Sequence, residues 1–341
     1  MNTSPLFATD LPLTSELTET TVLVRKGSRF LATFRLATQG GAAVLALDEF
    51  SSLDEDIAPE VLRDALRVLF CHRRDLGEVN VDVGSQEDLA RRLDRRGLIF
   101  GPKLGSDRYG GICRRSVFFQ HREPWLTQEP SAGYPLSYVL SHGRRHPRRP
   151  PIALGTVYRR KTTESGPTVS FRTIDPSDHL ELFHRWMNEP RVAVFWELAG
   201  SQEEHADYLA KTLADPHVHP LVGFFDEQPF GYFEAYWAKE DRIAPFYDVD
   251  DYDRGIHMLV GEKSQRGPHR VGAWLPSLVH YLFLDDPRTR NVVAEPRADN
   301  ARMIDYLKRT GFFKTKEFDF PHKRAAMMIL PRETFFDQFC P

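Results

Sequence analysis

Apolar and polar positions along the first third of the chain form short runs that are separated by two amphipathic stretches. Five runs have the length and the β-branched or aromatic content of strands: 21–26, 29–36, 43–48, 79–83 and 113–120. Residues 58–74 and 86–97 instead repeat apolar side chains at helical spacing. The predicted order of elements in this region is therefore β-β-β-α-β-α-β.

The second half shows the same kinds of pattern over a longer segment. Strands are predicted at 168–175, 221–226, 230–237, 255–261, 291–296, 312–320 and 324–330. Helices are predicted at 177–188, 201–214, 269–284 and 300–311. Ser177 and Ser201 are suitable N-caps, Gly311 is a suitable C′ residue, and Pro276 predicts a kink or a break. The β-β-β-α-β-α-β series occurs again within this order, which indicates two related units.

Residues 123–167 separate the two halves and have the composition of a linker. They are rich in Pro, Gly and Arg, and HGRRHPRRPP at 142–151 is the sharpest break. This basic run could bind phosphate, but an extended, solvated connector is the simpler interpretation. We therefore expect a first domain at 1–122, this linker, and a second domain at 168–341.

Composition narrows the class of protein. A chain of 341 residues suggests about two domains. Its 45 Lys and Arg nearly balance 48 Asp and Glu, which gives no overall attraction to nucleic acid or to an anionic membrane. Three scattered cysteines without zinc-ligand spacing predict neither a disulfide framework nor a metal site. Without a signal-peptide pattern or an 18-residue apolar run, we expect a cytoplasmic protein with no membrane segment.

The loop after strand 255–261 has the features of an anion site. The chain turns through residues 262–267 into a helix, whose N-terminus offers N–H groups and the positive end of the helix dipole. Lys263 and Arg266 add positive charge. Such a loop suits the pyrophosphate of coenzyme A, although an ordinary strand–loop–helix connection would look similar.

Three stretches of the second half carry a family resemblance. They are GYFEAYWAKEDRIAPFYDVDDYDRGIHMLVGEKSQRG at 231–267, VVAEPRADNARM at 292–303 and YLKRTGF at 306–312. In this order they resemble the GCN5-related N-acetyltransferase (GNAT) family, and most closely its siderophore-biosynthesis branch, which acylates N-hydroxylated lysine, ornithine or diamines. The resemblance implies an α+β fold with a mixed, largely antiparallel central sheet flanked by helices. With the repeated element order, it implies two such units in tandem.

The resemblance also implies catalytic residues. His257 lies inside the strand 255–261, and Asp299 precedes the helix that follows the next strand. A carboxylate within reach of a histidine would fix its tautomer and raise its basicity, as general acid–base catalysis requires. The alternative is that His257 is a core histidine and Asp299 a helix cap.

Further residues are assigned to acetyl-CoA, or another acyl-CoA, on the same resemblance. They are Leu259, Val260, Lys263, Gln265, Arg266, Gly267, His269, Arg270 and Asn300. The loop keeps the family's opening residues 265–267, but residues 268–270 are Pro-His-Arg where the family has small residues. Asn300 could instead cap the helix. For the acceptor we expect Trp196, Glu234 and Tyr236, with Asp241 and Asp253 as further carboxylates for a cationic group.

The first half lacks the same anion site. Its turn from Asp48 to Asp56 has five carboxylates and no glycine, and would repel a pyrophosphate. We therefore expect a degenerate unit or a capping domain that does not bind coenzyme A.

The leading hypothesis is an acyl-CoA-dependent acyltransferase that converts a small-molecule hydroxylamine into a hydroxamate for a siderophore. A siderophore synthetase or an N-hydroxylase is the expected protein partner, and no metal is expected. Two alternatives stay open: an aminoglycoside or polyamine N-acetyltransferase, and a non-catalytic scaffold for a siderophore synthetase.

Overall fold

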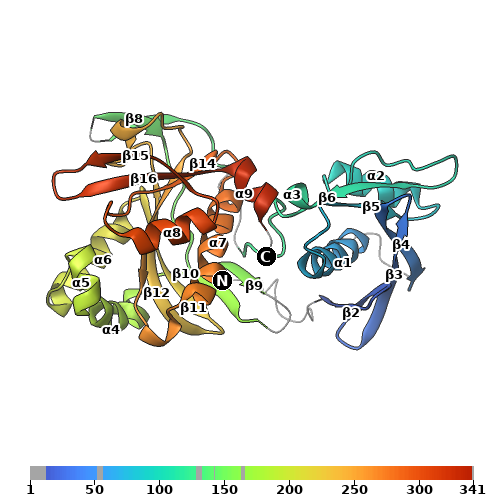
Figure 1. The fold of residues 1–341 in the computed structure, drawn as a ribbon, viewed down its shortest axis with the longest axis horizontal. Helices are drawn as coiled ribbons and strands as arrows, with labels where there is room; N and C mark the ends of the chain where they lie inside the picture. The colour runs from blue at the N-terminus through green and yellow to red at the C-terminus, as the bar shows by residue number, and fades with distance from the viewer. Residues whose placement is uncertain (1–12, 52–56, 128–132, 142, 163–165, 340–341) are drawn as a thin grey trace, which may run out of the picture. The chain divides into compact units, whose positions relative to one another are not determined.

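The structure is a computed structural model that describes residues 13–51, 57–127, 133–141, 143–162 and 166–339. The chain divides into two compact units, of which the first ends at Phe119 and the second runs from Gln120 to Phe339 (Figure 1). We call them the N-terminal unit and the C-terminal unit.

The N-terminal unit contains a six-stranded sheet in the order β1-β2-β3-β4-β5-β6, in which only β4 and β5 are parallel. Its strands are β1 (Leu13–Leu17), β2 (Thr21–Lys26), β3 (Arg29–Gln39), β4 (Ala42–Phe50), β5 (Glu78–Asp82) and β6 (Gly110–Arg114). Its helices are α1 (Ala58–His72), α2 (Glu87–Arg95) and α3 (Arg115–Phe118). The predicted order is confirmed from β2 to β6, but β1 was not predicted and the strand expected at 113–120 ends early, at Arg114. The buried side chain of Arg115 donates to the carbonyls of Phe70 and Arg73, which holds the chain in a helical turn there.

The C-terminal unit contains an eight-stranded sheet in the order β15-β16-β14-β13-β12-β11-β10-β9 and a two-stranded sheet, β7-β8. Its strands are β7 (Tyr138–Ser141), β8 (Arg144–Pro147), β9 (Thr156–Lys161), β10 (Thr168–Thr173), β11 (Val218–Phe225), β12 (Gln228–Trp237), β13 (Arg254–Val260), β14 (Asn291–Ala294), β15 (Phe313–Asp319) and β16 (Arg324–Pro331). Its α-helices are α4 (Pro176–Met187), α5 (Pro190–Trp196), α6 (Gln202–Ala214), α7 (Pro268–Asp285), α8 (Ala301–Arg309) and α9 (Arg332–Gln338). Only β13 and β14 are parallel, so a mixed, largely antiparallel sheet is confirmed in both units.

Local sequence signals account for several helix ends. Ser201 caps α6 in a complete capping box with Glu204, as expected. Asp175, rather than Ser177, caps α4 through a bond from the Ser177 N–H. Gly311 follows α8 at a φ of +100°, which favours glycine.

Helix α7 runs through Pro276 without a break. Arg160 of β9 donates to the Ala273 carbonyl and to the Ser277 hydroxyl beside the proline, which supports this turn from outside the helix. The sequence could not indicate this contact, because it joins residues more than a hundred positions apart.

Residues 123–167 are not an extended connector. They supply β7, β8 and β9, and β9 pairs with β10 at one edge of the large sheet. Arg149, whose side chain is buried, forms two hydrogen bonds of 2.6 Å to Glu240 and lies over the Trp237 ring. The basic run therefore folds onto the C-terminal unit through a tertiary ion pair, and the expectation of a solvated segment is wrong.

Helices cover both faces of the large sheet (Figure 1). On one face Phe233 of β12 packs against Trp274 of α7, with ring centroids 5.1 Å apart. On the other face Tyr232, the preceding residue of β12, packs against Phe183 of α4 at 4.8 Å. Alternation along β12 therefore separates a core under α7 from a second core under α4–α6.

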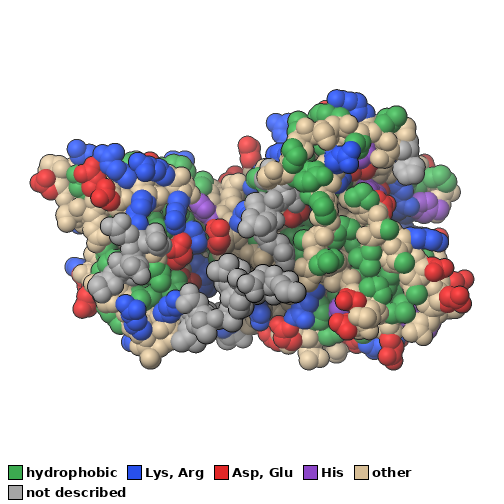
Figure 2. Space-filling view, turned by 180° about the vertical axis from the view of Figure 1, so that it is seen from behind, with side chains coloured by type: hydrophobic (Ala, Val, Ile, Leu, Met, Phe, Trp, Pro, Cys, Tyr) green, Lys and Arg blue, Asp and Glu red, His purple; other side chains and the backbone are tan. Residues whose placement is uncertain are grey.

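The surface shows both signs of charge on each unit (Figure 2). This distribution agrees with the small net charge of −3. Within the described residues, no helix combines the length and the apolar character that crossing a bilayer requires.

Candidate functional site

The centre of the site is set by the register of three neighbouring strands. Glu234 of β12 lies directly opposite His257 of β13. Strand β14 runs parallel to β13 with Val293 opposite Gly255, so Glu295, two residues beyond Val293, reaches the level of His257. All three side chains lie on the face that also carries Tyr232.

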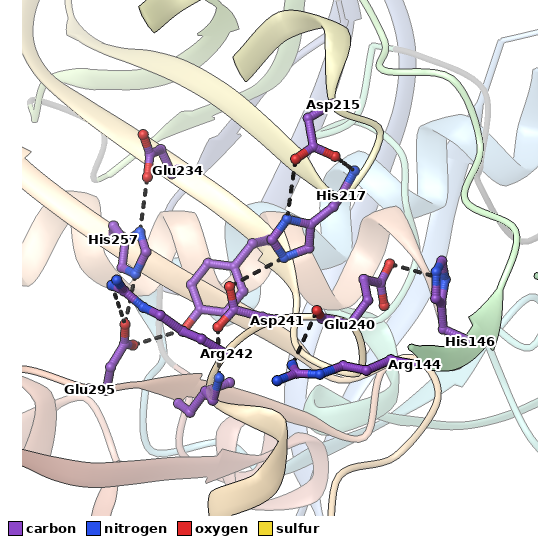
Figure 3. A network of polar contacts seen from close by, with 12 residues as sticks. Arg144, His146, Asp215, His217, Glu234, Glu240, Asp241, Arg242, His257 and Glu295 are labelled. Carbon is purple, nitrogen blue, oxygen red and sulfur yellow. Dashed lines mark hydrogen bonds and ion pairs between the residues drawn. The ribbon is translucent and has the colours of Figure 1, made fainter. Parts of the chain in front are cut away.

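His257 is held between two carboxylates (Figure 3). Its Nδ1 lies 2.9 Å from Glu234 Oε2, and its Nε2 lies 2.7 Å from Glu295 Oε1. Both carboxylate side chains are almost completely buried, whereas the His257 side chain is 26% exposed. The imidazole is therefore the most exposed member of the group.

Each carboxylate has its own set of supporting donors. Tyr232 donates to Glu234 Oε1 at 3.0 Å, and Tyr208 of α6 donates to the same oxygen. Tyr236 donates to Glu295 Oε2 at 2.8 Å. Such bonds are what stabilises buried charges, because an unpaired buried carboxylate would be strongly unfavourable.

Charge pairing dominates the ionisation of this group. Burial disfavours the charged form of His257, but attraction to Glu295 and hydrogen bonds to both carboxylates raise the pKa of His257 to about 10. Burial also opposes the ionised form of Glu295, yet the charge and hydrogen bond of His257 lower its pKa to about 2. The pKa of Glu234 is lowered against burial for the same reason. The resting state at neutral pH is an imidazolium between two carboxylates.

Two glycines make room for large aromatic side chains around this group. A Cβ on Gly255 would lie 2.0 Å from the Tyr236 ring, and a Cβ on Gly261 would lie 2.2 Å from the Trp186 ring. Any side chain at either position would force a buried ring to move. The glycines of the segment GIHMLVG are therefore required for packing.

Strand β13 has an open edge next to His257. It pairs with β12 over seven residues but with β14 at only two, Arg254 and Gly255. The Gly261 N–H donates to the Phe230 carbonyl, so by the alternation of an antiparallel pair Met258 and Val260 turn their backbone groups away from β12. Along residues 256–260, within the described part of the chain, no strand lies on this side.

The expected coenzyme contacts in β13 are only partly available. The Val260 carbonyl accepts a bond from Arg191 Nη1 at 2.8 Å, and Leu259 points its side chain into the core with Phe183 and Trp186. By the same alternation, the backbone of Leu259 faces β12. Met258, which the sequence did not single out, is thus better placed than Leu259 to bond a ligand through its backbone.

The loop before α7 retains the features of an anion site. Residues 263–265 form a short 3₁₀ helix, and Gly267, at a φ of +132°, immediately precedes the first residue of α7. Lys263, Arg266 and His269 are exposed. Among the described residues, none bonds the buried Gln265 Oε1. Arg270 instead lies over the Phe225 ring at 4.7 Å, away from the loop.

Asp299 is not the partner of His257. It forms an ion pair with Arg297 at 2.8 Å, and its side chain is 67% exposed. Asn300 caps α8 by accepting a bond from the Met303 N–H at 3.2 Å. The carboxylate that the sequence interpretation assigned to Asp299 is supplied by Glu295, four residues earlier in the same EPRADN stretch.

The proposed acceptor residues fall into two groups. The Trp196 ring, at the end of α5, meets His257 edge-to-face at 6.3 Å, and Tyr236 lies 4.8 Å from the same ring. Asp253 is completely buried and accepts bonds from Asn291 and Tyr247, so it cannot contact an acceptor. Asp241 accepts from the Ile243 N–H and lies 3.3 Å from His217 Nε2.

Sequence reasoning missed Glu295 because strand register decides its position. The available signal was the apolar run VVA followed by a carboxylate, since Val293 and Glu295 share a face. Among the described residues, no group of three or more His, Cys, Asp or Glu side chains is arranged to hold a metal ion.

The amino-acid sequence is similar to those of known acyltransferases. Residues 175–320 match the family model described as acetyltransferase (GNAT) domain. The N(6)-hydroxylysine O-acetyltransferase of Escherichia coli is 47% identical over 228 residues, which cover 67% of this chain and 72% of that protein. The N(5)-hydroxyornithine:cis-anhydromevalonyl coenzyme A-N(5)-transacylase SIDF of Beauveria bassiana is 47% identical over 215 residues, covering 62% of this chain and 47% of that protein. The match to the fungal relative thus spans about half of its length.

A solved structure supports the fold. An uncharacterized protein from Bacillus halodurans superposes with a TM-score of 0.51 at 30% identity, covering 54% of this chain and 94% of that one. The residues that match the family model lie within the C-terminal unit. The chain therefore belongs to the GNAT acetyltransferase family and stands among members that are named for acyl transfer to hydroxylysine and hydroxyornithine.

Proposed function

We propose that this protein transfers an acetyl group, or another acyl group, from coenzyme A to an N-hydroxylated amine and so forms a hydroxamate for a siderophore. The observation that carries the proposal is the Glu234–His257–Glu295 group beside the open edge of β13. The three side chains can transfer protons, and they lie next to the edge of β13, with which an extended ligand can form backbone hydrogen bonds. The names of the two sequence relatives support a hydroxylated amino acid as the acceptor.

The C-terminal unit has groups that fit acyl-CoA. The pantetheine arm would run along residues 256–260, where, within the described residues, no strand pairs with the Met258 backbone on the side away from β12. The diphosphate would lie at the loop of residues 263–267, where Lys263 and Arg266 supply positive charge. Helix α7 adds the positive end of its dipole. These residues are our candidates for coenzyme binding.

Transfer would be direct, within a complex of both substrates. The sequence has no cysteine from residue 114 to 339, so an acyl-cysteine intermediate lacks a nucleophile near the site. The largest contribution would come from holding the hydroxylamine nitrogen against the thioester carbonyl. Trp196, whose ring meets His257 edge-to-face, would bind the acceptor chain, whereas Tyr236 is buried and supports Glu295 from behind. Backbone N–H groups of the open edge would polarise the carbonyl.

The proposed reaction also implies which enzymes act before and after this protein. An N-hydroxylase must supply the acceptor, and a synthetase that joins hydroxamate units would consume the product. These two enzyme classes are the partners that we propose for this protein.

Thiol release from acetyl-CoA tests the function. The full chain is assayed with N6-hydroxylysine, N5-hydroxyornithine, N-hydroxycadaverine, the three parent amines and kanamycin. We expect thiol release and a hydroxamate with at least one hydroxylated acceptor, and far less with its parent amine. Preference for a parent amine or for kanamycin would instead support an amine or aminoglycoside acetyltransferase. Coenzyme binding without turnover of any acceptor would support the scaffold.

A further inference from the structure

The roles of the three central residues can be assigned by following protons. Both nitrogens of His257 lie at hydrogen-bond distance from a carboxylate oxygen, so both carry hydrogen at rest. A doubly protonated imidazole has no lone pair with which to accept a proton. His257 can therefore donate a proton in the first step, but it cannot accept one.

The two carboxylates differ in how many donors already occupy them. Glu234 accepts from Tyr208, Tyr232 and His257 Nδ1. Glu295 accepts from Tyr236 and His257 Nε2 only, among the side-chain hydrogen bonds of the described residues. Glu295 Oε1 also lies 3.8 Å from Arg242, whose side chain is 49% exposed. Glu295 thus has fewer hydrogen-bond donors than Glu234, although both side chains are buried, at 1% and 8% exposed.

We propose that Glu295 is the general base of the reaction and that His257, which starts protonated, is the general acid. This assignment rests on the proposed acyl transfer. The hydroxylamine nitrogen forms a bond to the thioester carbon and becomes cationic, and its proton passes to Glu295. The carbon–sulfur bond then breaks, and His257 gives a proton to the thiolate. Glu295 returns its proton to His257, which restores the starting state.

The coupling between the two residues makes these transfers mutually favourable. Once Glu295 is neutral, the imidazolium loses the nearer of the charges that hold its proton, so His257 becomes a stronger acid when the thiolate needs a proton. The proton that Glu295 accepts comes from a nitrogen that is already cationic, so a weakly basic carboxylate is sufficient. The low pKa of Glu295, about 2, agrees with a base that is ionised throughout the working range.

Other charged and titratable groups also face this couple. Arg242 from the loop after β12 and Lys323 from the turn before β16, at 3.8 and 4.0 Å, favour the ionised form of Glu295. Glu234 holds Nδ1 and fixes the ring with Nε2 toward Glu295, as a positioning residue. The tyrosines on both carboxylates have pKa values raised by burial and by the adjacent charges, so they stay protonated.

A matched pair of variants tests the assignment. Glu295→Gln and Glu234→Gln each remove one carboxylate charge from the same ring, but only the first removes the proposed base. We expect Glu295→Gln to lower kcat by about 10²–10⁴ with unchanged acetyl-CoA affinity, and Glu234→Gln to lower it markedly less. Glu295→Asp should recover part of the loss. Equal losses in both variants would show that only charge matters and would overturn the assignment.

The charge of His257 is a second readout that does not need an acceptor. NMR of the full chain with ¹⁵N-labelled histidine, compared with His257→Gln, should show a doubly protonated ring at pH 7.5. In wild type, kcat should then lack a rising limb near pH 6.5. A neutral ring at pH 7.5 overturns the assignment even if transfer is confirmed. If wild type acylates no hydroxylated amine, the proposed function fails, and the NMR result still decides whether the protonated couple exists.

Discussion

The two units share a β-β-β-α-β-α-β series but place different chemistry beside the parallel strand pair of each sheet. In each unit one pair of central strands is parallel, and that pairing ends at Ala46–Asp82 in the N-terminal unit and at Gly255–Val293 in the C-terminal unit. Two residues beyond the end stands Asp48 in the first case and His257 in the second. Asp48 is 41% exposed and pairs with Arg35, whereas His257 joins two buried carboxylates.

This difference shows that the shared fold only places a residue beside the parallel strand pair. The side chains at that place decide whether a functional site forms. Two residues beyond Val293 the C-terminal unit has Glu295, and two residues beyond Asp82, the matching position, the N-terminal unit has Gly84. The latter has no side chain with which to bind a partner. Much of the acidic turn that we expected to repel coenzyme A lies at residues 52–56, outside the described residues, so that expectation stays a prediction.

Replacing His257 should give the largest contrast between the units. His257→Gln should lower kcat by about 10²–10⁴, because it removes the group that exchanges protons with the substrates. The matched change Asp48→Asn should leave kcat unchanged. Steady-state thiol release at saturating substrates measures both, with thermal melting as the check on folding. A comparable loss in the two variants would mean that the N-terminal unit takes part in the reaction.

Charge reversal at the anion loop should affect coenzyme binding next most strongly. Arg266→Glu removes a charged donor near the expected diphosphate, a change worth about 1.5–3 kcal/mol, which raises the acetyl-CoA Kd by about 10- to 150-fold. Arg91→Glu on α2 is the matched reversal in the N-terminal unit and should have no effect. Calorimetric titration with acetyl-CoA measures both constants. Equal affinity in wild type and Arg266→Glu would place the diphosphate elsewhere.

The stability of the C-terminal unit should depend on alkaline pH through His257. Its folded pKa of about 10 exceeds the ordinary value of about 6.5, so its stabilising contribution is complete below pH 6.5 and is lost as pH rises through 10. The advantage of wild type over His257→Gln should shrink by up to about 1.4 kcal/mol per pH unit across that window. Urea unfolding at pH 7, 8.5 and 10 measures it. An advantage that is constant with pH would contradict a charged His257.

Of the four predictions in this comparison, Asp299→Asn should have the smallest effect. An exposed ion pair such as Asp299–Arg297 contributes about 0–1 kcal/mol, and Asn300 still caps α8. We expect kcat and the melting temperature to stay close to the wild-type values. A loss of kcat as large as that of His257→Gln would restore Asp299 to the catalytic group.

Sequence patterns predicted the elements well where their signals are local. Ser201, Gly311 and the apolar runs of the two sheets act within a few residues, and the structure agrees with them. The basic run around Arg149 was misinterpreted because its burial depends on Glu240, more than ninety residues away. Helix α5 was missed because its seven residues are too few for a clear helical period.

The difference between local signals and contacts between distant residues also explains which site residues the sequence predicted. His257 and its expected partner Asp299 were both taken from the family resemblance, which pairs the strand histidine with the aspartate of the EPRADN stretch. The correct choice of Glu295 needs the register between β13 and β14, and that register is a property of the folded sheet.

The two glycines of GIHMLVG have a consequence for how this motif is used to recognise active members. Gly255 and Gly261 are fixed by the rings of Tyr236 and Trp186, and neither contributes a functional group. A descendant that had lost all activity would keep both for as long as it kept these rings. A search pattern built on the glycines therefore reports an intact fold, and only one that also demands Glu234, His257 and Glu295 would distinguish a working enzyme from an inactive copy.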